Sequence, residues 1–116
     1  MISRHEGFPE ELAETERTAR CPTCAARRTP GATLCHRCRS DLTLLVAVET
    51  RAAALHEEAL THYAEGRFRT ALRLAADAAR HAARAETLEL LASAALRAGD
   101  YPAALAAARR RREGAR

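Results

Sequence analysis

The segment GRFRTAL, residues 66–72, returns 33 residues later as GDYPAAL, residues 99–105. Both segments place a glycine, an aromatic residue and an Ala-Leu pair at the same spacing. A period of this length is typical of helical-hairpin repeats, in which each unit packs on the next. The repeat therefore predicts an all-α second half of the chain. The matched positions are Gly66 and Gly99, Phe68 and Tyr101, Ala71 and Ala104, and Leu72 and Leu105.

Alanine, leucine, arginine and glutamate dominate the chain from residue 42 onward, and this composition favours helix. Asp41 is well placed to cap a helix running from about Thr43 to Glu65, and Gly66 is suited to end it. Asp100, followed by a proline in the first turn, indicates another helix start after the second glycine. We expect each glycine to separate the two helices of a hairpin, and the start of the first helix, residues 42–48, to pack as a cap on the repeats.

The repeat resembles the tetratricopeptide repeat (TPR) over roughly residues 52–116, as two units at about 52–84 and 85–116. In that family, glycine ends the first helix (helix A), the aromatic residue fills the turn, and alanine lets the second helix (helix B) pack closely. The chain departs from the family pattern at Leu55 and Leu88, where tryptophan is usual, and no proline lies near Ala83. An alanine-rich helical bundle without true repeat geometry is the alternative.

The resemblance implies that helix A residues on the concave side bind a peptide or another protein. Tyr63 is the only aromatic residue expected on that side, either as an anchor for a partner or as filling between helices. The lysine and asparagine pairs with which some family members clamp a C-terminal carboxylate are missing. The expected partner-binding residues are His56, Leu60, Tyr63, Glu89, Ser93, Leu96 and Arg97.

Two Cys-x-x-Cys pairs, CPTC at residues 21–24 and CHRC at residues 35–38, contain every cysteine of the chain. Four thiolates at this spacing can surround one tetrahedral ion with Zn–S distances of about 2.3 Å. The filled shell leaves no position for a reactive water, so we expect one structural Zn²⁺ per chain. Iron and thiol exchange are the lesser alternatives. The expected ligands are Cys21, Cys24, Cys35 and Cys38.

Residues 17–41 resemble the short zinc ribbon of bacterial multidomain proteins, through the two cysteine pairs and the Pro-Gly sequence between them. The resemblance implies short β-hairpins and turns. The chain departs from the pattern at Ala25 and Arg39, where glycine usually follows each pair and accepts a positive φ more readily. A segment this short cannot bury enough surface to fold alone, so the metal is expected to form its core.

Six arginines and no acidic residue lie between residues 17 and 39, which predicts a basic patch. Arg27 and Arg28, in the loop between the cysteine pairs, are the expected phosphate contacts. Residues 17–41 contain no aromatic side chain on which a base could stack. We therefore expect any nucleic-acid binding to be weak and unspecific.

Residues 1–16 carry five glutamates and few apolar side chains, and we interpret them as a flexible acidic arm. The sequence predicts neither a secretory signal nor a membrane span. Paired cysteines are typical of metal ligands in a reducing cytoplasm. The expected fold class is mostly α, with a small zinc ribbon at residues 17–41 followed by TPR-like repeats at residues 42–116.

These observations predict a cytoplasmic protein that acts as a non-enzymatic adaptor by binding another protein. The alternative is a nucleic-acid-associated accessory protein that uses the basic ribbon, and a redox or metal-handling protein comes third. The sequence leaves the partner, the pathway and the oligomeric state open.

Overall fold

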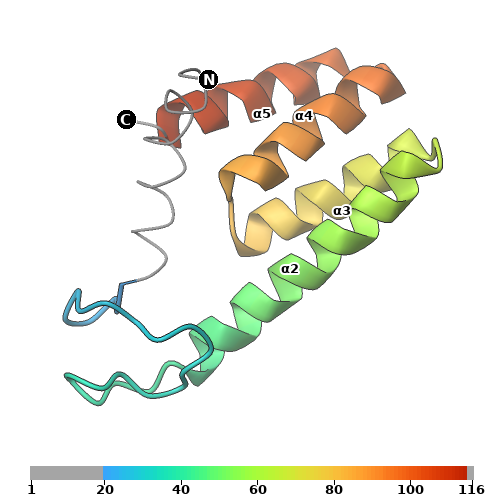
Figure 1. The fold of residues 1–116 in the computed structure, drawn as a ribbon. Coiled ribbons are helices and arrows are strands. Elements are labelled where there is room, and N and C mark those ends of the chain that lie inside the picture. The colour runs from blue at the N-terminus through green and yellow to red at the C-terminus, as the bar shows by residue number, and fades with distance from the viewer. Residues whose placement is uncertain (1–19, 115–116) are drawn as a thin grey trace, which may run out of the picture.

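The computed structural model describes residues 20–114, and the expected acidic arm at residues 1–16 lies outside them. The described part of the chain is mostly helical, as the sequence predicts, with four helices in the order α2 (Thr43–Ala64), α3 (Phe68–His81), α4 (Ala85–Ala98) and α5 (Tyr101–Gly114). Consecutive helices pack side by side, so that α3 lies against α2, α4 against α3, and α5 against α4 (Figure 1). We call residues 43–114 the helical array.

Residues 20–41, which we call the cysteine module, lie at the N-terminal end of α2 (Figure 1). The module contains two isolated antiparallel bridges, between Arg20 and Arg27 and between Leu34 and Asp41. Turns and irregular segments make up the rest of the module. The expected short hairpins are therefore reduced to single bridged pairs within the described residues.

Helix α2 begins and ends almost where the sequence predicts. The Asp41 carboxylate accepts hydrogen bonds from the Thr43 backbone N–H at 2.9 Å and from the Thr43 hydroxyl at 2.6 Å. The first of these bonds satisfies a backbone donor that the first turn leaves without a helical partner. Both bonds hold the pKa of the Asp41 carboxyl below its usual value. The N-cap residue is therefore Leu42, not Asp41 as predicted, and the Asp41 carboxylate bonds the first turn from one residue earlier.

The two helix A candidates, α2 and α4, end in the same backbone motif. Gly66 and Gly99 adopt φ values of 82° and 83°, in the left-handed region that favours glycine. After α2, the Arg67 N–H donates to the His62 carbonyl, and after α4 the Asp100 N–H donates to the Ala95 carbonyl. This bond over five residues defines the Schellman motif, which turns the chain sharply into the next helix.

The start of α5 is capped as predicted. The Asp100 carboxylate accepts a hydrogen bond from the Ala103 backbone N–H at 3.2 Å. At the start of α3, Arg67 occupies the corresponding position and no side-chain cap bond is present. The two hairpins thus share the glycine turn but differ in how helix B begins.

The core of the helical array is built from small side chains. Ala59 of α2, Ala71 and Ala75 of α3, and Ala94 and Ala95 of α4 are fully buried. Alanine lets helix backbones approach closely, and leucines fill the space between them. The buried leucines of this core are Leu72, Leu88, Leu90 and Leu91.

The first turns of α2 pack away from this core. We expected residues 42–48 to pack as a cap on the repeats. This expectation is wrong for the buried side chains of this segment, which contact the cysteines instead. Leu42 is 3% exposed and packs with Cys21 and Cys35, and Leu45 packs against the same cluster. The start of α2 therefore supports the cysteine module.

Candidate metal centre and the neighbouring groove

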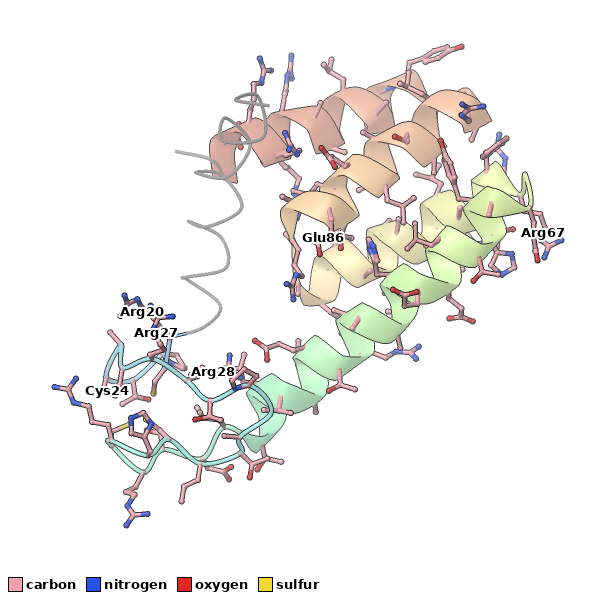
Figure 2. The ribbon with its side chains drawn as sticks, viewed as in Figure 1. Arg20, Cys24, Arg27, Arg28, Arg67 and Glu86 are labelled. Atoms are coloured by element: carbon pink, nitrogen blue, oxygen red, sulfur yellow. The ribbon has the colours of Figure 1, made fainter. Side chains whose placement is uncertain are left out.

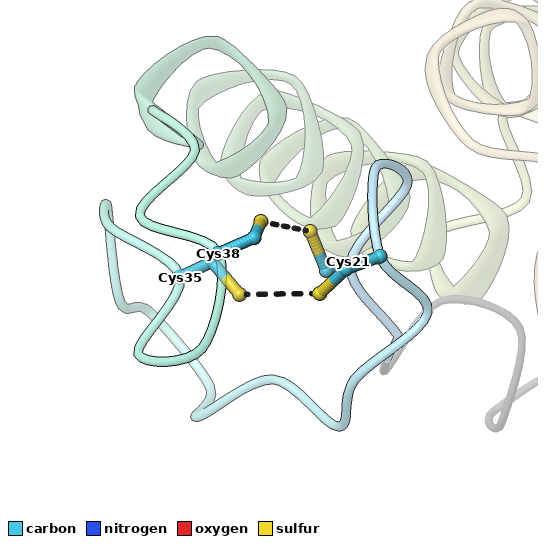
Figure 3. Close-up of side chains that lie close together, drawn as sticks. Cys21, Cys35 and Cys38 are labelled. Carbon is cyan, nitrogen blue, oxygen red and sulfur yellow. Dashed lines mark hydrogen bonds between the residues drawn. The ribbon is translucent and has the colours of Figure 1, made fainter.

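The four cysteines predicted as ligands converge at one point (Figure 3). The Sγ atoms of Cys21 and Cys38 lie 3.7 Å apart, and those of Cys24 and Cys35 lie 3.8 Å apart. All four sulfurs lie within 4.8 Å of one another. Separations of this size are too long for disulfide bonds, whose S–S length is about 2.05 Å.

The spacing of the sulfurs fits a tetrahedral ion. A Zn–S distance of about 2.3 Å requires neighbouring sulfurs to lie about 3.8 Å apart, by tetrahedral geometry. The two measured separations match this edge length. The four cysteines can therefore hold a metal ion such as zinc, with one sulfur from each residue.

The two Cys-x-x-Cys segments fold as copies of one another, 14 residues apart. The Cys21 N–H donates to the Ala26 carbonyl at 2.8 Å, and the Cys35 N–H donates to the Ser40 carbonyl at 2.9 Å. The Ala25 N–H donates to the Cys21 carbonyl, and in the second segment the Arg39 N–H donates to the Cys35 carbonyl. We call each of these turns a knuckle.

The residues that stand in place of glycine adopt the strained conformation. Ala25 has φ 63° and Arg39 has φ 65°, which places both in the left-handed region. For a side chain with a Cβ, this conformation costs roughly 1–2 kcal/mol. The knuckle geometry is kept despite the departure from glycine, because the backbone bonds and the sulfur positions both require it.

Backbone N–H groups aim at the first sulfur of each knuckle. The N–H groups of Cys38 and Arg37 lower the pKa of the Cys35 thiol to about 6. The N–H groups of Cys24 and Thr23 likewise lower the pKa of Cys21, and the Thr23 nitrogen lies 3.4 Å from the Cys21 sulfur. Donors placed this way favour the thiolate, which is the form that binds metal.

The second cysteine of the first knuckle is in a different environment. The Ala26 N–H acts to lower the pKa of Cys24, but burial and the three neighbouring sulfurs together outweigh it and raise the pKa to about 11. The sulfur of Cys38 lies 3.0 Å from the Ser40 hydroxyl. Four thiols crowded at one point cannot all ionise without a cation between them, and this favours a bound metal.

An ion pair fastens the cysteine module to α2. The Arg28 guanidinium donates two hydrogen bonds to the Glu49 carboxylate, at 2.9 and 3.0 Å. The Arg28 side chain is only 5% exposed. Hydrogen bonding to Glu49 raises the pKa of the guanidinium, so Arg28 stays charged.

This pair corrects the assignment of Arg28 as a phosphate contact. Its guanidinium is buried and turned toward α2, whereas Arg20 and Arg27 lie together at the edge of the cysteine module (Figure 2). Arg27 remains exposed. Composition alone could not identify this difference, because a buried and an exposed arginine look the same in a sequence.

A groove runs between α2 and α4 on one side of the helical array. His56, Leu60 and Tyr63 line it from α2. From α4 it is lined by Glu86, Glu89, Leu90, Ala92 and Ser93, and its volume is about 520 Å³. We call it the α2–α4 groove.

Five of the seven residues expected to bind a partner line this groove, namely His56, Leu60, Tyr63, Glu89 and Ser93. Leu96 is 56% exposed but does not line it. Arg97 lies against the aromatic rings at the end of the first hairpin, with its guanidinium carbon 5.9 Å from the Tyr63 ring centre and 5.5 Å from that of Phe68.

Tyr63 combines both roles that the sequence leaves open. Its ring meets Phe68 edge to face at 5.2 Å and packs against the core of the array. Its hydroxyl accepts a hydrogen bond from Arg97 Nε at 3.1 Å. The same side chain lines the α2–α4 groove, so it stabilises the turn and is also accessible from the groove.

Sequence reasoning missed two polar residues that connect distant parts of the chain. Thr87 is 2% exposed, and its hydroxyl lies 3.1 Å from His56 Nδ1. This contact joins α4 to α2. The other missed residue is Glu49, which looked like an ordinary surface glutamate.

Comparison of the chain with family models, with curated proteins and with solved structures finds no match. Among the helices of residues 20–114, none combines the length and the apolar character needed to cross a membrane. The function is therefore inferred from the geometry of the chain itself.

Proposed function

We propose that the protein is a non-enzymatic adaptor, with a structural Zn²⁺ in the cysteine module and a peptide-binding groove on a TPR-like array. The α2–α4 groove carries this proposal, because it combines apolar side chains with polar groups that can orient a ligand. Leu60 is 40% exposed within it. An exposed leucine beside a tyrosine provides the anchor that peptide recognition needs.

Zinc is the metal favoured by the chemistry of four thiolates in a tetrahedral arrangement. When bound, it would supply charge neutralisation and a rigid crosslink between the two knuckles. Cys21, Cys24, Cys35 and Cys38 would hold it. Four sulfur ligands fill the shell, which supports a structural role over a catalytic one. A reducing compartment such as the cytoplasm would keep these thiols available to the metal.

The TPR-like assignment is supported by the two Schellman turns at Gly66 and Gly99 and by their spacing of one repeat. Concave grooves of such arrays are formed by consecutive A helices. In this chain the corresponding helices are α2 and α4, and the groove lies between them.

The test is selection of peptides on the full chain, followed by binding titrations with a groove variant. Ser93→Arg places a long charged side chain in the groove and is expected to weaken binding of the selected peptides at least tenfold. The matched control is Ala106→Arg, which puts the same side chain on an exposed position of α5. Equal binding to both variants, or failure to select any peptide, would overturn the proposal.

A second candidate rests on the exposed arginines of the cysteine module, which are Arg20, Arg27, Arg37 and Arg39. They favour contact with phosphate groups, although the burial of Arg28 removes one of the expected contacts. Anisotropy titrations with a labelled single-stranded DNA test this candidate at two salt concentrations. Weak binding that disappears at physiological salt would match simple charge attraction. Tight, sequence-dependent binding would favour the nucleic-acid function over the adaptor.

A further inference from the structure

The last helix of the array, α5, has an exposed apolar stripe. Tyr101 is 64% exposed and Leu105 is 51% exposed. Ala108 and Arg112 are exposed as well. These four positions follow one another at intervals of four, three and four residues, so they lie on one face of the helix. We call Tyr101, Leu105 and Ala108 the α5 stripe.

The first repeat covers the face that corresponds to the α5 stripe. Shifted by 33 residues, Leu105 and Ala108 correspond to Leu72 and Ala75 of α3, which are 9% and 0% exposed. Helix α3 packs between α2 and α4, whereas within residues 20–114 the one helix packed along α5 is α4. Arrays of helical repeats end in a cap with a polar outer face, so the α5 stripe is the face that a cap would cover.

The C-terminal half of α5 carries an excess of positive charge beside the stripe. Arg109, Arg110 and Arg112 are exposed, and none of them forms an ion pair within the described part of the chain. Arg111 is turned toward α4 and pairs with a glutamate there. Glu113 is the only acidic residue between positions 101 and 114, so the exposed side of this helix end stays positive. It therefore fits an acidic occupant.

The chain itself contains a segment with the matching pattern. Residues 8–16, with the sequence FPEELAETE, carry four glutamates and no basic residue. Phe8 and Leu12 are four positions apart, as are Tyr101 and Leu105 of the stripe. We call residues 8–16 the acidic segment, and they lie outside the residues that the structure describes.

The acidic segment is joined to the chain near the basic end of α5. Arg20 lines the same hollow as Arg84, which directly precedes α4. In the second turn of α4, Glu89 pairs with Arg111 of α5 at 3.0 Å. The C-terminal end of α5 therefore lies on the side of the array that carries the cysteine module (Figure 1). Glu14 precedes Arg20 by six residues, which reach about 20 Å when extended.

We propose that the acidic segment docks along α5 and covers the α5 stripe as the cap of the helical array. Its two apolar side chains pack on the stripe, and Glu14 and Glu16 face Arg109 and Arg112. The direction follows from the connection to the module, because the C-terminal end of the segment is held nearest to the basic end of α5. Modest contacts are sufficient, since the connection gives the segment a high effective concentration. No residue of α5 lines the α2–α4 groove, so the two sites are separate.

Cross-linking of the full chain loaded with Zn²⁺ tests this contact. The sequence contains no lysine, so Arg112→Lys adds a single side-chain amine at the basic end of α5. A water-soluble carbodiimide joins an amine to a carboxylate where the two are in contact, and mass spectrometry of the digest identifies the glutamate. We expect cross-links to the acidic segment to be about fivefold or more as abundant as with Arg73→Lys, an exposed control on α3. Equal yields from the two variants, or no cross-link to the segment, would overturn the proposal.

Two variants, each made together with Arg112→Lys, test the role of the stripe. Leu105→Asp places a carboxylate in the stripe and is expected to lower the yield of these cross-links about fivefold or more. Ala106→Asp, at an exposed position of α5 outside the stripe, is the matched control and is expected to change the yield less than twofold. Helical circular dichroism is recorded for both. A folded Leu105→Asp protein with an unchanged yield would contradict the docking face.

Substitutions in the acidic segment itself leave the core of the array untouched. Phe8→Ser combined with Leu12→Ser is expected to lower the cross-link yield by a similar factor, because the apolar contacts with the stripe are lost. Ile2→Ser, which lies outside the segment, is the control and is expected to leave the yield unchanged. An unchanged yield in the double variant would equally overturn the proposal.

The size of the cross-linked product identifies which chain supplies the segment. A product of single-chain mass, formed at a yield independent of protein concentration, supports docking within one chain. A two-chain product whose yield rises with concentration would overturn the proposal and assign the face to a second copy. Ser93→Arg in the α2–α4 groove is expected to leave the yield unchanged, so the result does not depend on the proposed function of the groove.

Discussion

The cysteine module and the helical array are stabilised by different physical interactions. Among the described residues, the buried cluster at the module consists of Cys21, Cys35 and the adjoining Leu42, whereas the array buries alanines and leucines from four helices. A cluster this small cannot offset the conformational entropy of ordering the module, so we propose that a bound metal provides much of its stability. The array needs no such crosslink, because its apolar contacts are distributed along whole helices.

The largest effect is expected from removing one thiolate. Cys24→Ser should unfold residues 21–40 and release the metal, because structural zinc contributes roughly 10–16 kcal/mol of apparent binding free energy in small zinc domains. Most of the helical circular-dichroism signal should remain, since the array has its own core. Elemental analysis gives the metal content. Complete loss of helicity would show that the two regions unfold as one unit.

The complementary experiment lowers the stability of the helical array. Leu55 is the largest side chain that is fully buried in the described part of the chain, at 2% exposed. Leu55→Ala should lower the free energy of unfolding by about 2–5 kcal/mol and the melting temperature by about 10 °C or more. The metal content measured at room temperature should stay at that of the wild type. A variant that loses metal along with helix stability would break the distinction between the two regions.

The link between the regions is expected to have an intermediate effect. Glu49→Ala leaves the buried Arg28 without its carboxylate and should cost about 1.5–3 kcal/mol. Because Arg28 belongs to the module and Glu49 to α2, the loss should lower both metal affinity and the stability of the first turns of α2. Hydrogen exchange of these turns, with Glu58→Ala as an exposed control on the same helix, checks the expectation.

Comparison of the regions also explains what the sequence could predict. The helix-start hydrogen bonds at Asp41 and Asp100 and the turns at Gly66 and Gly99 depend on neighbouring residues, so their patterns are visible in the sequence. The convergence of the four cysteines was also predictable, because two closely spaced Cys-x-x-Cys pairs are typical of a tetrahedral metal site.

The contacts that were missed join residues far apart in the chain. His56 and Thr87 are 31 positions apart, and Arg28 and Glu49 are 21 positions apart. Each pair depends on how one element docks on another, and its members are ordinary surface types when taken alone. The same reason explains why Leu42 was assigned to the wrong core. From the sequence alone, an apolar residue at the start of α2 could pack on the helical array or on the cysteine module.

A smaller effect should come from the residues that replace glycine in the knuckles. Ala25→Gly and Arg39→Gly remove the left-handed strain, partly offset by the greater freedom of glycine in the unfolded chain. Each should stabilise the metal-bound module by about 0.5–1 kcal/mol, a two- to fivefold gain in metal affinity by competition with a chelator. Ala32→Gly serves as the control, since that residue lies outside the positive-φ positions. A similar gain in metal affinity for Ala32→Gly would show that the effect does not come from relief of the left-handed backbone conformation.

The smallest effect concerns the carboxylate where the two regions meet. Hydrogen bonds from the Thr43 hydroxyl and backbone N–H lower the pKa of Asp41. Since the folded pKa lies below the unfolded one, the carboxylate contributes stability above the unfolded pKa, about 3.9 for aspartate, and loses it as the pH falls through the folded value. Asp41→Asn keeps an oxygen acceptor for the cap but does not titrate in this range.

Thermal unfolding of the array is therefore compared between wild type and Asp41→Asn in metal-free protein. Without the metal, competition between protons and metal for the thiols does not add to the pH dependence. The advantage of wild type over the variant should be constant from neutral pH down to about pH 5 and should shrink below about pH 4, as the carboxylate takes up a proton. A difference that stays constant down to pH 2 would show that Asp41 stabilises α2 through its shape alone. In that case its negative charge would play no part at the start of the helix.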